Sequence, residues 1–236
     1  MTTLQKTLVV GYWTLTAAAF AAAIALIFLW TPEEATMGPI QKIFYFHLPI
    51  AITTFLACTV TFIASIGYIT QRKTWWDDLA ASSAFISVLL CSGVLITGMI
   101  WARGAWGVWW TWSPRLTFSF MLWLLYVVNL LVRSSIESAQ RRAMVSAVYA
   151  IVAFLDVPLV FLSANMLPDI HPSSIGLAPA MKLTLALCFI PIVLLAAGLL
   201  VTRYRLARLQ RAQRTAVAEV AANENVYAAS LARGLA

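Results

Sequence analysis

Residues 43–71 read IFYFHLPIAITTFLACTVTFIASIGYITQ, a run of 29 positions without Asp, Glu, Lys or Arg. An α-helix rises about 1.5 Å per residue, so roughly 20 apolar residues cross the ~30 Å hydrocarbon layer of a bilayer. Backbone N–H and C=O groups find no water inside lipid, and a run of this kind must therefore be helical. The stretch predicts a transmembrane helix.

Five further apolar stretches lie on either side of this one, each bracketed by charged residues. They lie between Lys6 and Glu33, Asp78 and Arg103, Arg115 and Arg133, Arg142 and Asp169, and Lys182 and Arg203. The stretch after Arg115 is short, at 17 residues, and we expect its helix to begin one turn earlier, among the preceding aromatic residues. Only 11% of the residues are charged, against about a quarter in soluble domains. The sequence thus predicts an all-α integral membrane protein with six transmembrane helices.

The first of these stretches has a second interpretation, that of a cleaved signal peptide. A lone Lys6 precedes it, and small residues fill its middle. Its apolar run nevertheless continues as far as Trp30, beyond the 7–15 residues of a typical signal-peptide core. We therefore expect a retained helix.

The positive charges are unequally divided between the two sides of the predicted bundle. With the N-terminus inside, 12 of the 16 Lys and Arg residues are cytoplasmic. The other four are outside, namely Lys42, Arg103, Arg115 and Lys182. Cytoplasmic loops carry an excess of Lys and Arg, so this division predicts a multi-pass protein of the cytoplasmic membrane with both termini inside.

The positive net charge of +7 has no pattern that indicates nucleic-acid binding. No cluster of Lys and Arg is interleaved with aromatic residues, and we expect no nucleic-acid partner. We expect a six-helix membrane domain at residues 1–202 and a basic cytoplasmic tail at residues 203–236. The arginines of the tail would meet anionic lipid headgroups or water.

The three cysteines, Cys58, Cys91 and Cys188, each lie inside an apolar run. None belongs to a CxxC or CxxCH motif, so the chain is not itself a c-type cytochrome and has no recognisable thiol-redox motif. We expect them to act as small buried hydrophobic residues.

Tryptophan is concentrated between the third and fourth predicted helices. Five of the ten tryptophans lie within 12 residues, at Trp101, Trp106, Trp109, Trp110 and Trp112. An interfacial aromatic belt would instead spread tryptophans over many helix ends, and this alternative stays open. Because aromatic rings stack and bury much area, an outward-facing loop of this kind suits a large, flat, apolar ligand.

The chain has two histidines, His47 and His171, and both fall on the predicted outer side. Proline is tolerated in a first helical turn, so Pro49 predicts that the second helix begins near His47. Neutral imidazole is a good iron ligand, and heme needs one or two axial ligands. Each histidine could also be an ordinary hydrogen-bonding residue at the interface.

Three further charged residues have an open role. Asp156 is the only acid within a predicted span, and its burial in lipid costs a few kcal/mol. It is either functional or a protonated carboxyl that bonds a neighbouring helix near a kink at Pro158. Arg103 and Arg115 flank the tryptophans and either pair with carboxylates of a ligand or are ordinary interfacial arginines.

The tryptophan segment carries a family resemblance. WARGAWGVWWTWSPRLT, residues 101–117, resembles the WWD signature W-G-x-x-W-x-W-D-x-R of heme-handling membrane proteins in cytochrome c biogenesis. IFYFHLPIA and DVPLVFLSANMLPDIHPSS are similar to the two axial-histidine segments of the cytochrome c maturation protein C family. Length, six spans and two histidines fit that family, whereas its F-type and system II relatives are larger and have four histidines. The resemblance covers roughly residues 40–200.

Two positions depart from the family pattern. Ser113 replaces the family's Asp, which removes a negative charge beside the last tryptophan. Asn165 and Met166, or their neighbours, replace a Trp pair ahead of the second histidine. These departures bear on how heme is delivered and to which chaperone.

The resemblance implies a heme-handling and transfer subunit rather than a free-standing enzyme. It implies that heme b is bound transiently at the periplasmic face of the bacterial inner membrane, with His47 and His171 as axial ligands. The five tryptophans would cover the macrocycle and dock a partner, and Arg103 or Arg115 would meet the propionates. The implied partners are a membrane-anchored periplasmic heme chaperone, an ATP-binding cassette transporter pair and a small single-span subunit.

Three rival functions stay open. A b-type cytochrome that exchanges electrons with quinone usually has four histidines across the membrane, and here two lie on one side. A transporter of heme or another solute predicts charged or polar residues along several spans, and Asp156 is the only charged residue within a span. A structural subunit whose tryptophans dock a partner would purify without heme.

Overall fold

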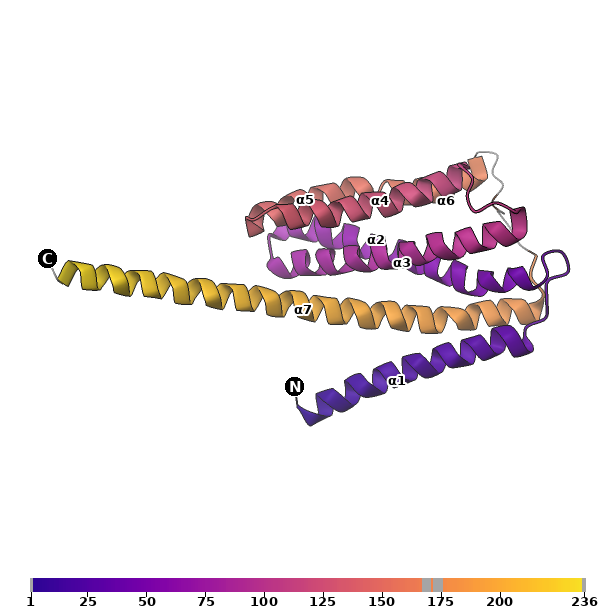
Figure 1. The fold of residues 1–236 in the computed structure, drawn as a ribbon, viewed down its shortest axis with the longest axis horizontal. Coiled ribbons are helices and arrows are strands. Elements are labelled where there is room, and N and C mark those ends of the chain that lie inside the picture. Colours follow the sequence, from indigo (N-terminus) through magenta and orange to yellow (C-terminus); the bar gives the residue numbers. More distant parts are fainter. Residues whose placement is uncertain (1, 167–170, 172–175, 235–236) are drawn as a thin grey trace.

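The computed structural model describes residues 2–166, 171 and 176–234. Its elements are helices, in the order α1 (Thr3–Ala25), η1 (Leu26–Trp30), η2 (Pro39–Ile43), α2 (Phe44–Gln71), α3 (Thr74–Trp106), α4 (Pro114–Ser135), α5 (Ala139–Ala153), α6 (Asp156–Met166) and α7 (Pro179–Gly234). They form six spans that are long and apolar enough to cross a membrane, as the sequence predicts. The spans run up and down, and α7 continues far beyond the bundle (Figure 1).

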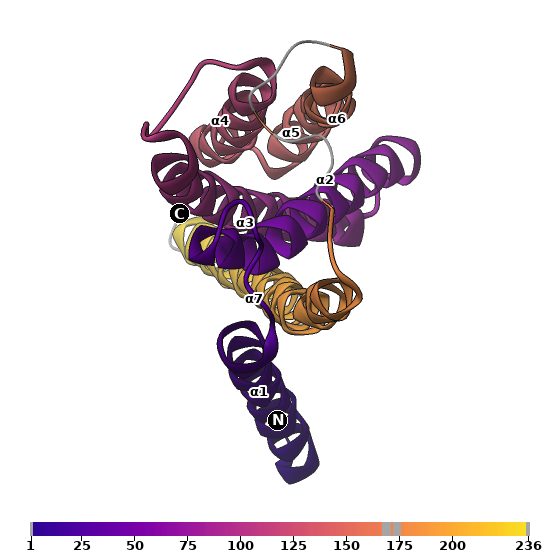
Figure 2. The same ribbon diagram turned by 90° about the vertical axis from the view of Figure 1, so that its right-hand side faces the viewer.

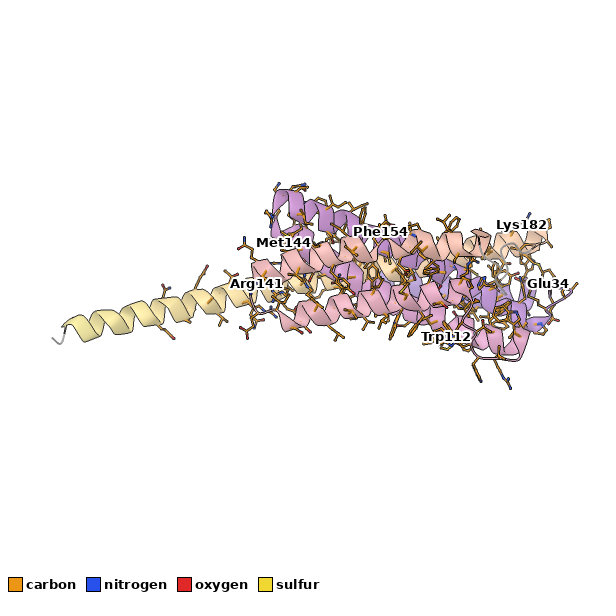
Figure 3. The ribbon with its side chains drawn as sticks, turned by 90° about the horizontal axis from the view of Figure 1, so that it is seen from above. Glu34, Trp112, Arg141, Met144, Phe154 and Lys182 are labelled. Carbon is orange, nitrogen blue, oxygen red and sulfur yellow. The ribbon has the colours of Figure 1, made fainter. Side chains whose placement is uncertain are left out.

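The two ends of the bundle have different side chains. We call the end with Glu34, Trp112 and Lys182 the loop end; the opposite end, with Arg141 and Met144, is the tail end (Figure 3). Both chain termini point away from the loop end, and α7 projects past the tail end (Figure 1). The tryptophan-rich connection between the third and fourth spans therefore lies at the loop end.

Helices α2 and α3 form the centre of the molecule and pack most extensively against each other. Figure 2 shows α4, α5 and α6 on one side of this pair and α7, followed by α1, on the other. Small residues let the two central helices approach closely, as is common within membranes. A Cβ atom at Gly67 of α2 would lie 2.5 Å from the Trp76 ring of α3, and the Ser83 hydroxyl donates to the Ala57 carbonyl at 2.7 Å. These contacts hold α2 and α3 together along the centre of the bundle.

Helix α1 lies at the edge of the molecule and packs mainly against α7. The Tyr12 hydroxyl donates to the Leu194 carbonyl, and a Cβ atom at Gly198 would lie 2.6 Å from the Tyr12 ring. Leu8 and Leu15 of α1 are exposed in the isolated chain. Such apolar side chains have lipid or another membrane helix as their natural neighbours.

An ion network closes the tail end. Arg133 of α4 donates two hydrogen bonds to Asp77 of α3, at 2.6 and 2.8 Å. Arg211 of α7 bonds Asp77 at 3.0 Å and Asp78 at 2.5 Å. Arg203 lies over the Phe85 ring, 4.3 Å from its centre. At least these two arginines of the basic tail therefore meet protein groups rather than lipid or water alone, and the domain boundary after residue 202 stays a prediction.

Two helix starts differ from the expected ones. Helix α2 begins at Phe44, and a 3-10 turn from Pro39 to Ile43 precedes it, whereas Pro49 had indicated a start near His47. Pro49 lies inside the helix, where it has no N–H to donate to the Tyr45 carbonyl. Helix α4 begins at Pro114 and not one turn earlier, because proline favours the first helical position.

The fifth span consists of two helices. Helix α5 ends at Ala153, and α6 begins at Asp156 after a turn at Phe154 and Leu155. Pro158 lies in the first turn of α6, where its missing N–H costs little. The helix is thus interrupted at Phe154 and Leu155, one turn before Pro158, near which a kink was predicted.

Candidate functional site

The two histidines lie side by side at the loop end. His47 is in the first turn of α2, and His171 is in the segment between α6 and α7. Their ring centres are 6.4 Å apart, and the ring planes are inclined by 36°. Both side chains are half-buried. Residues far apart in the sequence thus form one site.

The spacing of the rings fits a metal held between two imidazoles. With metal–nitrogen bonds of about 2 Å and ring centres about 1.1 Å behind the bonding atoms, two opposed imidazoles have centres roughly 6 Å apart. Within the described residues, no group of three or more His, Cys, Asp or Glu side chains is placed to hold a bare metal ion. A pair of imidazoles suits heme, because the porphyrin supplies the other ligands of the iron.

Helix α3 holds the His47 ring in place. The Nδ1 atom of His47 lies 2.9 Å from the Thr97 hydroxyl oxygen, which is also 2.7 Å from the Gly93 carbonyl oxygen. The ring lies against Gly98, where an added Cβ would come within 3.3 Å of the His47 Cε1 atom. Neither Thr97 nor Gly98 was predicted as a site residue, because a threonine and a glycine in an apolar span have no distinctive pattern.

Arg115, in the first turn of α4, contacts the second histidine. Its Nη1 atom lies 2.9 Å from the His171 Nδ1 atom. A guanidinium has donors only, so Arg115 donates this hydrogen bond and the ring nitrogen accepts it. Arg115, a candidate partner for the propionates of heme, therefore lies beside His171, a candidate iron ligand.

The five tryptophans form two groups rather than one loop. Trp101 and Trp106 belong to the last turns of α3 and meet edge to face, with ring centres 4.9 Å apart. We call them the inner pair, because the Trp101 ring centre is 6.4 Å from that of His171. Trp109, Trp110 and Trp112 follow in the true loop, and we call them the outer group. Helix α3 ends where Gly107 adopts a left-handed conformation, with φ at 76°, which glycine adopts without strain.

The outer group is partly packed and partly exposed. Trp110 and Trp112 have ring centres 5.8 Å apart, and both contact Phe120 of α4. Trp112 is 74% exposed and Trp109 is 58% exposed. Exposed aromatic rings are typical both of binding surfaces and of the aromatic belt at a membrane interface. Phe120 is a further aromatic member that sequence reasoning missed.

The sequence of this chain matches a known protein family. A family model described as "Heme exporter protein C" matches residues 1–221. The chain belongs to the heme exporter protein C family. The resemblance inferred from the tryptophan and histidine segments is therefore confirmed, and the chain is a multi-pass membrane protein of that family.

Curated relatives carry the same name. The heme exporter protein C of Bradyrhizobium diazoefficiens is 29% identical over 145 residues, which cover 61% of this chain and 55% of the relative. That of Rhodobacter capsulatus is 30% identical over 125 residues, covering 53% and 52%. That of Escherichia coli K12 is 26% identical over 199 residues, covering 79% and 80%. The chain thus spans about half the length of the first two relatives and most of the third.

The other charged candidates, Arg103 and Asp156, have contacts with groups other than the two histidines. Arg103 folds back and donates to the Gly107 carbonyl. Asp156 is 4% exposed, and its electrostatic neighbours are Cys58, Cys91 and Tyr126 in the core. Neither Asp156 oxygen has a hydrogen-bond partner among the described residues. The structure brings His47, His171, the inner pair and Arg115 together and leaves Asp156 outside.

Of the two departures from the family pattern, the structure describes the side chain at the first, Ser113. Ser113 precedes α4 as its N-cap residue, and its buried hydroxyl makes no hydrogen bond within the described part of the chain. An Asp at this position would place a negative charge at a helix N-terminus, where it is favourable. The side chains of Asn165 and Met166 lie outside the described residues.

Proposed function

We propose that this protein binds heme b in transit at the periplasmic face of the bacterial inner membrane and presents it to a membrane-anchored heme chaperone during cytochrome c biogenesis. The observation that carries the proposal is the 6.4 Å pairing of the His47 and His171 rings. Membership of the heme exporter protein C family supports the choice of heme as cargo.

In this proposal each group of the site has one role. His47 and His171 are the axial ligands of the iron, and the inner pair covers one part of the macrocycle by aromatic contact. Arg115 is the better propionate partner, because its guanidinium lies 2.9 Å from the ring of His171, the proposed iron ligand. A guanidinium offers paired donors that match a carboxylate.

The outer group is the proposed docking surface for the chaperone. Trp109 and Trp112 are its most exposed members, and aromatic residues are enriched where proteins bind each other. Family membership also supports assembly with an ATP-binding cassette transporter pair and a small single-span subunit. The exposed apolar face of α1 is available to such a subunit or to lipid.

The proposed orientation has the loop end in the periplasm. Arg72, Lys73, Arg133, Arg141 and Arg142 border the tail end, in the connections between α2 and α3 and between α4 and α5. Lys42, Arg103, Arg115 and Lys182 border the loop end. The excess of positive charge favours a cytoplasmic tail end.

The test is the heme that co-purifies with single histidine variants. We expect His47→Ala and His171→Ala each to lose bound heme and its bis-imidazole spectrum, while Lys182→Ala, at the same end but outside the site, keeps both. Wild-type heme content in both histidine variants would refute the proposal. A b-type cytochrome is disfavoured because both histidines lie at one end of the bundle, which leaves no second heme pair across the membrane.

A further inference from the structure

The hydrogen bonds of His47 determine which of its ring nitrogens carries a proton. The Thr97 hydroxyl has a single hydrogen, and its two other partners are the carbonyl oxygens of Gly93, at 2.7 Å, and Val94, at 3.2 Å. A carbonyl oxygen only accepts, so Thr97 donates to the backbone and accepts from His47. The hydrogen of the neutral ring is therefore on Nδ1, and the lone pair on Nε2 is available to a metal.

The hydrogen bond of His171 has the opposite effect. Because Arg115 donates to Nδ1 at 2.9 Å, the neutral ring carries its hydrogen on Nε2. The Nδ1 lone pair is engaged by the guanidinium, and Nε2 has no lone pair to offer. While this contact lasts, neither nitrogen of His171 can bind iron.

From this asymmetry we propose that the two imidazoles are unequal ligands. The hydrogen bond with Thr97 keeps the Nε2 lone pair of His47 available to iron. The hydrogen bond from Arg115 prevents His171 from binding iron until an anionic group of the cargo binds the guanidinium instead. The inference rests on the proposed function, since it assumes an iron porphyrin as cargo. It adds that Thr97 is a positioning residue and that Arg115 regulates the second ligand.

The charges of the groups explain why Arg115 would change partner. The interaction of a guanidinium with a carboxylate joins two full charges through paired hydrogen bonds, whereas its bond to a neutral imidazole joins one charge to a dipole. A propionate within reach of Arg115 therefore competes well against His171. The released ring exchanges its hydrogen from Nε2 to Nδ1 through water, with no net gain or loss of protons, and Nε2 can then bind iron.

Removing the carboxylates of the cargo tests this exchange. Purified full-length protein in lipid nanodiscs is titrated with ferric heme b and, separately, with its dimethyl ester, which lacks the two negative charges. We expect wild-type protein to form a six-coordinate, low-spin species with heme and to form it with the ester at least about 10-fold less readily, since partners of metal-binding histidines change affinity on this scale.

Substitution of Arg115 supplies the second half of the test. Arg115→Met lacks the donor, and we expect it to make the six-coordinate species about equally well with both porphyrins. Arg115→Lys, which keeps a charged donor, and Lys182→Met, a charge removal outside the site, should both retain the preference for heme. A wild-type protein that makes no distinction between heme and ester, or an Arg115→Met variant that still prefers heme, would overturn the proposal for Arg115.

Thr97 is tested by a matched pair of variants. Thr97→Val keeps the shape but loses the hydroxyl, and we expect about a 10-fold lower affinity for heme and an altered electron paramagnetic resonance signal of the low-spin iron. Thr97→Ser restores the hydroxyl and should restore both. Thr59→Val removes a hydroxyl that bonds only within α2, to the Phe55 carbonyl, and serves as control.

The outcomes for Thr97 separate the inference from the proposed function. If the histidine variants lose heme but Thr97→Val behaves as wild type, the inference on Thr97 fails while the proposed function stands. If Thr97→Ser loses as much affinity as Thr97→Val, the role of Thr97 is packing and not hydrogen bonding, and the inference fails again. If the histidine variants keep heme, both proposals fail together.

Discussion

At the residue scale, the position of the His47 ring depends on the absence of a side chain on α3. The ring lies against Gly98, and a Cβ there would be 3.3 Å from its Cε1 atom, closer than an ordinary contact. Together with the Thr97 hydroxyl, this glycine fixes where the ring can lie. The site therefore depends on two residues that would not bind the cargo themselves.

We predict that Gly98→Ala displaces the His47 ring and lowers heme affinity by about 10-fold, because overpacking costs about 1–3 kcal/mol. Heme titration of the purified variant measures the loss. Gly93→Ala is the matched control on the same helix, since a Cβ there would meet Ile50 at an ordinary 3.5 Å. Equal affinities for the two variants would show that the approach of His47 to Gly98 has no functional effect.

Only some residues of the site could be predicted from the sequence. The two histidines and the tryptophans stand out because they are rare types in a chain of apolar residues. Thr97 does not, because most spans contain threonines, and several of them, such as Thr53, Thr59 and Thr61, donate to a carbonyl of their own helix. The contact of Arg115 with His171 was equally hidden, because it joins residues from distant parts of the chain.

At the element scale, charged residues at the ends of apolar runs were enough to locate the six spans. The helix ends themselves depended on local backbone chemistry. Helix α4 begins at Pro114, because proline favours the first helical position, and α3 ends where Gly107 adopts a left-handed conformation. The second span begins before His47, because a 3-10 turn from Pro39 to Ile43 precedes α2. For this reason the expected tryptophan loop became two groups, of which only the outer group is in a loop.

The ion network of α3, α4 and α7 yields a prediction at this scale. Arg133→Met leaves the buried Asp77 carboxylate without its two shortest hydrogen bonds. We expect a loss of about 2 kcal/mol or more in the free energy of unfolding, because removing one partner of a buried ion pair leaves the other uncompensated. Unfolding of the purified protein in mixed detergent micelles measures it.

The double variant Arg133→Met with Asp77→Asn checks the cause of that loss. Asn has no charge to leave unpaired, so we expect the double variant to recover part of the stability. Because Arg211 also binds Asp77 at 3.0 Å, the recovery should be incomplete. A double variant as unstable as Arg133→Met alone would indicate that packing, and not charge, accounts for the loss.

At the scale of the whole molecule, the fold gathers both histidines and all five tryptophans at one end. An even number of spans brings the N-terminus and the projecting α7 to the other side (Figure 1). The order of spans along the chain was predictable, whereas their packing was not. That α2 and α3 form the centre and α1 the edge depends on close contacts such as that of Gly67 with Trp76.

The proposed orientation predicts opposite accessibility for the two ends. In intact cells, a membrane-impermeant maleimide should label Trp109→Cys, which lies in the exposed outer group, and should not label Glu137→Cys at the tail end. Permeabilised cells should allow labelling of both. The native cysteines are buried and provide little background. Labelling of Glu137→Cys alone in intact cells would reverse the orientation and exclude a periplasmic site.

In the proposed complex, His47 and His171 together hold the iron of a heme. The most direct measurement is the absorption spectrum of heme-loaded His47→Gly and His171→Gly, before and after addition of free imidazole. We predict that each variant loses the six-coordinate, low-spin spectrum and regains it when imidazole enters the vacated position. A low-spin, six-coordinate spectrum that persists in both variants without imidazole would contradict the claim.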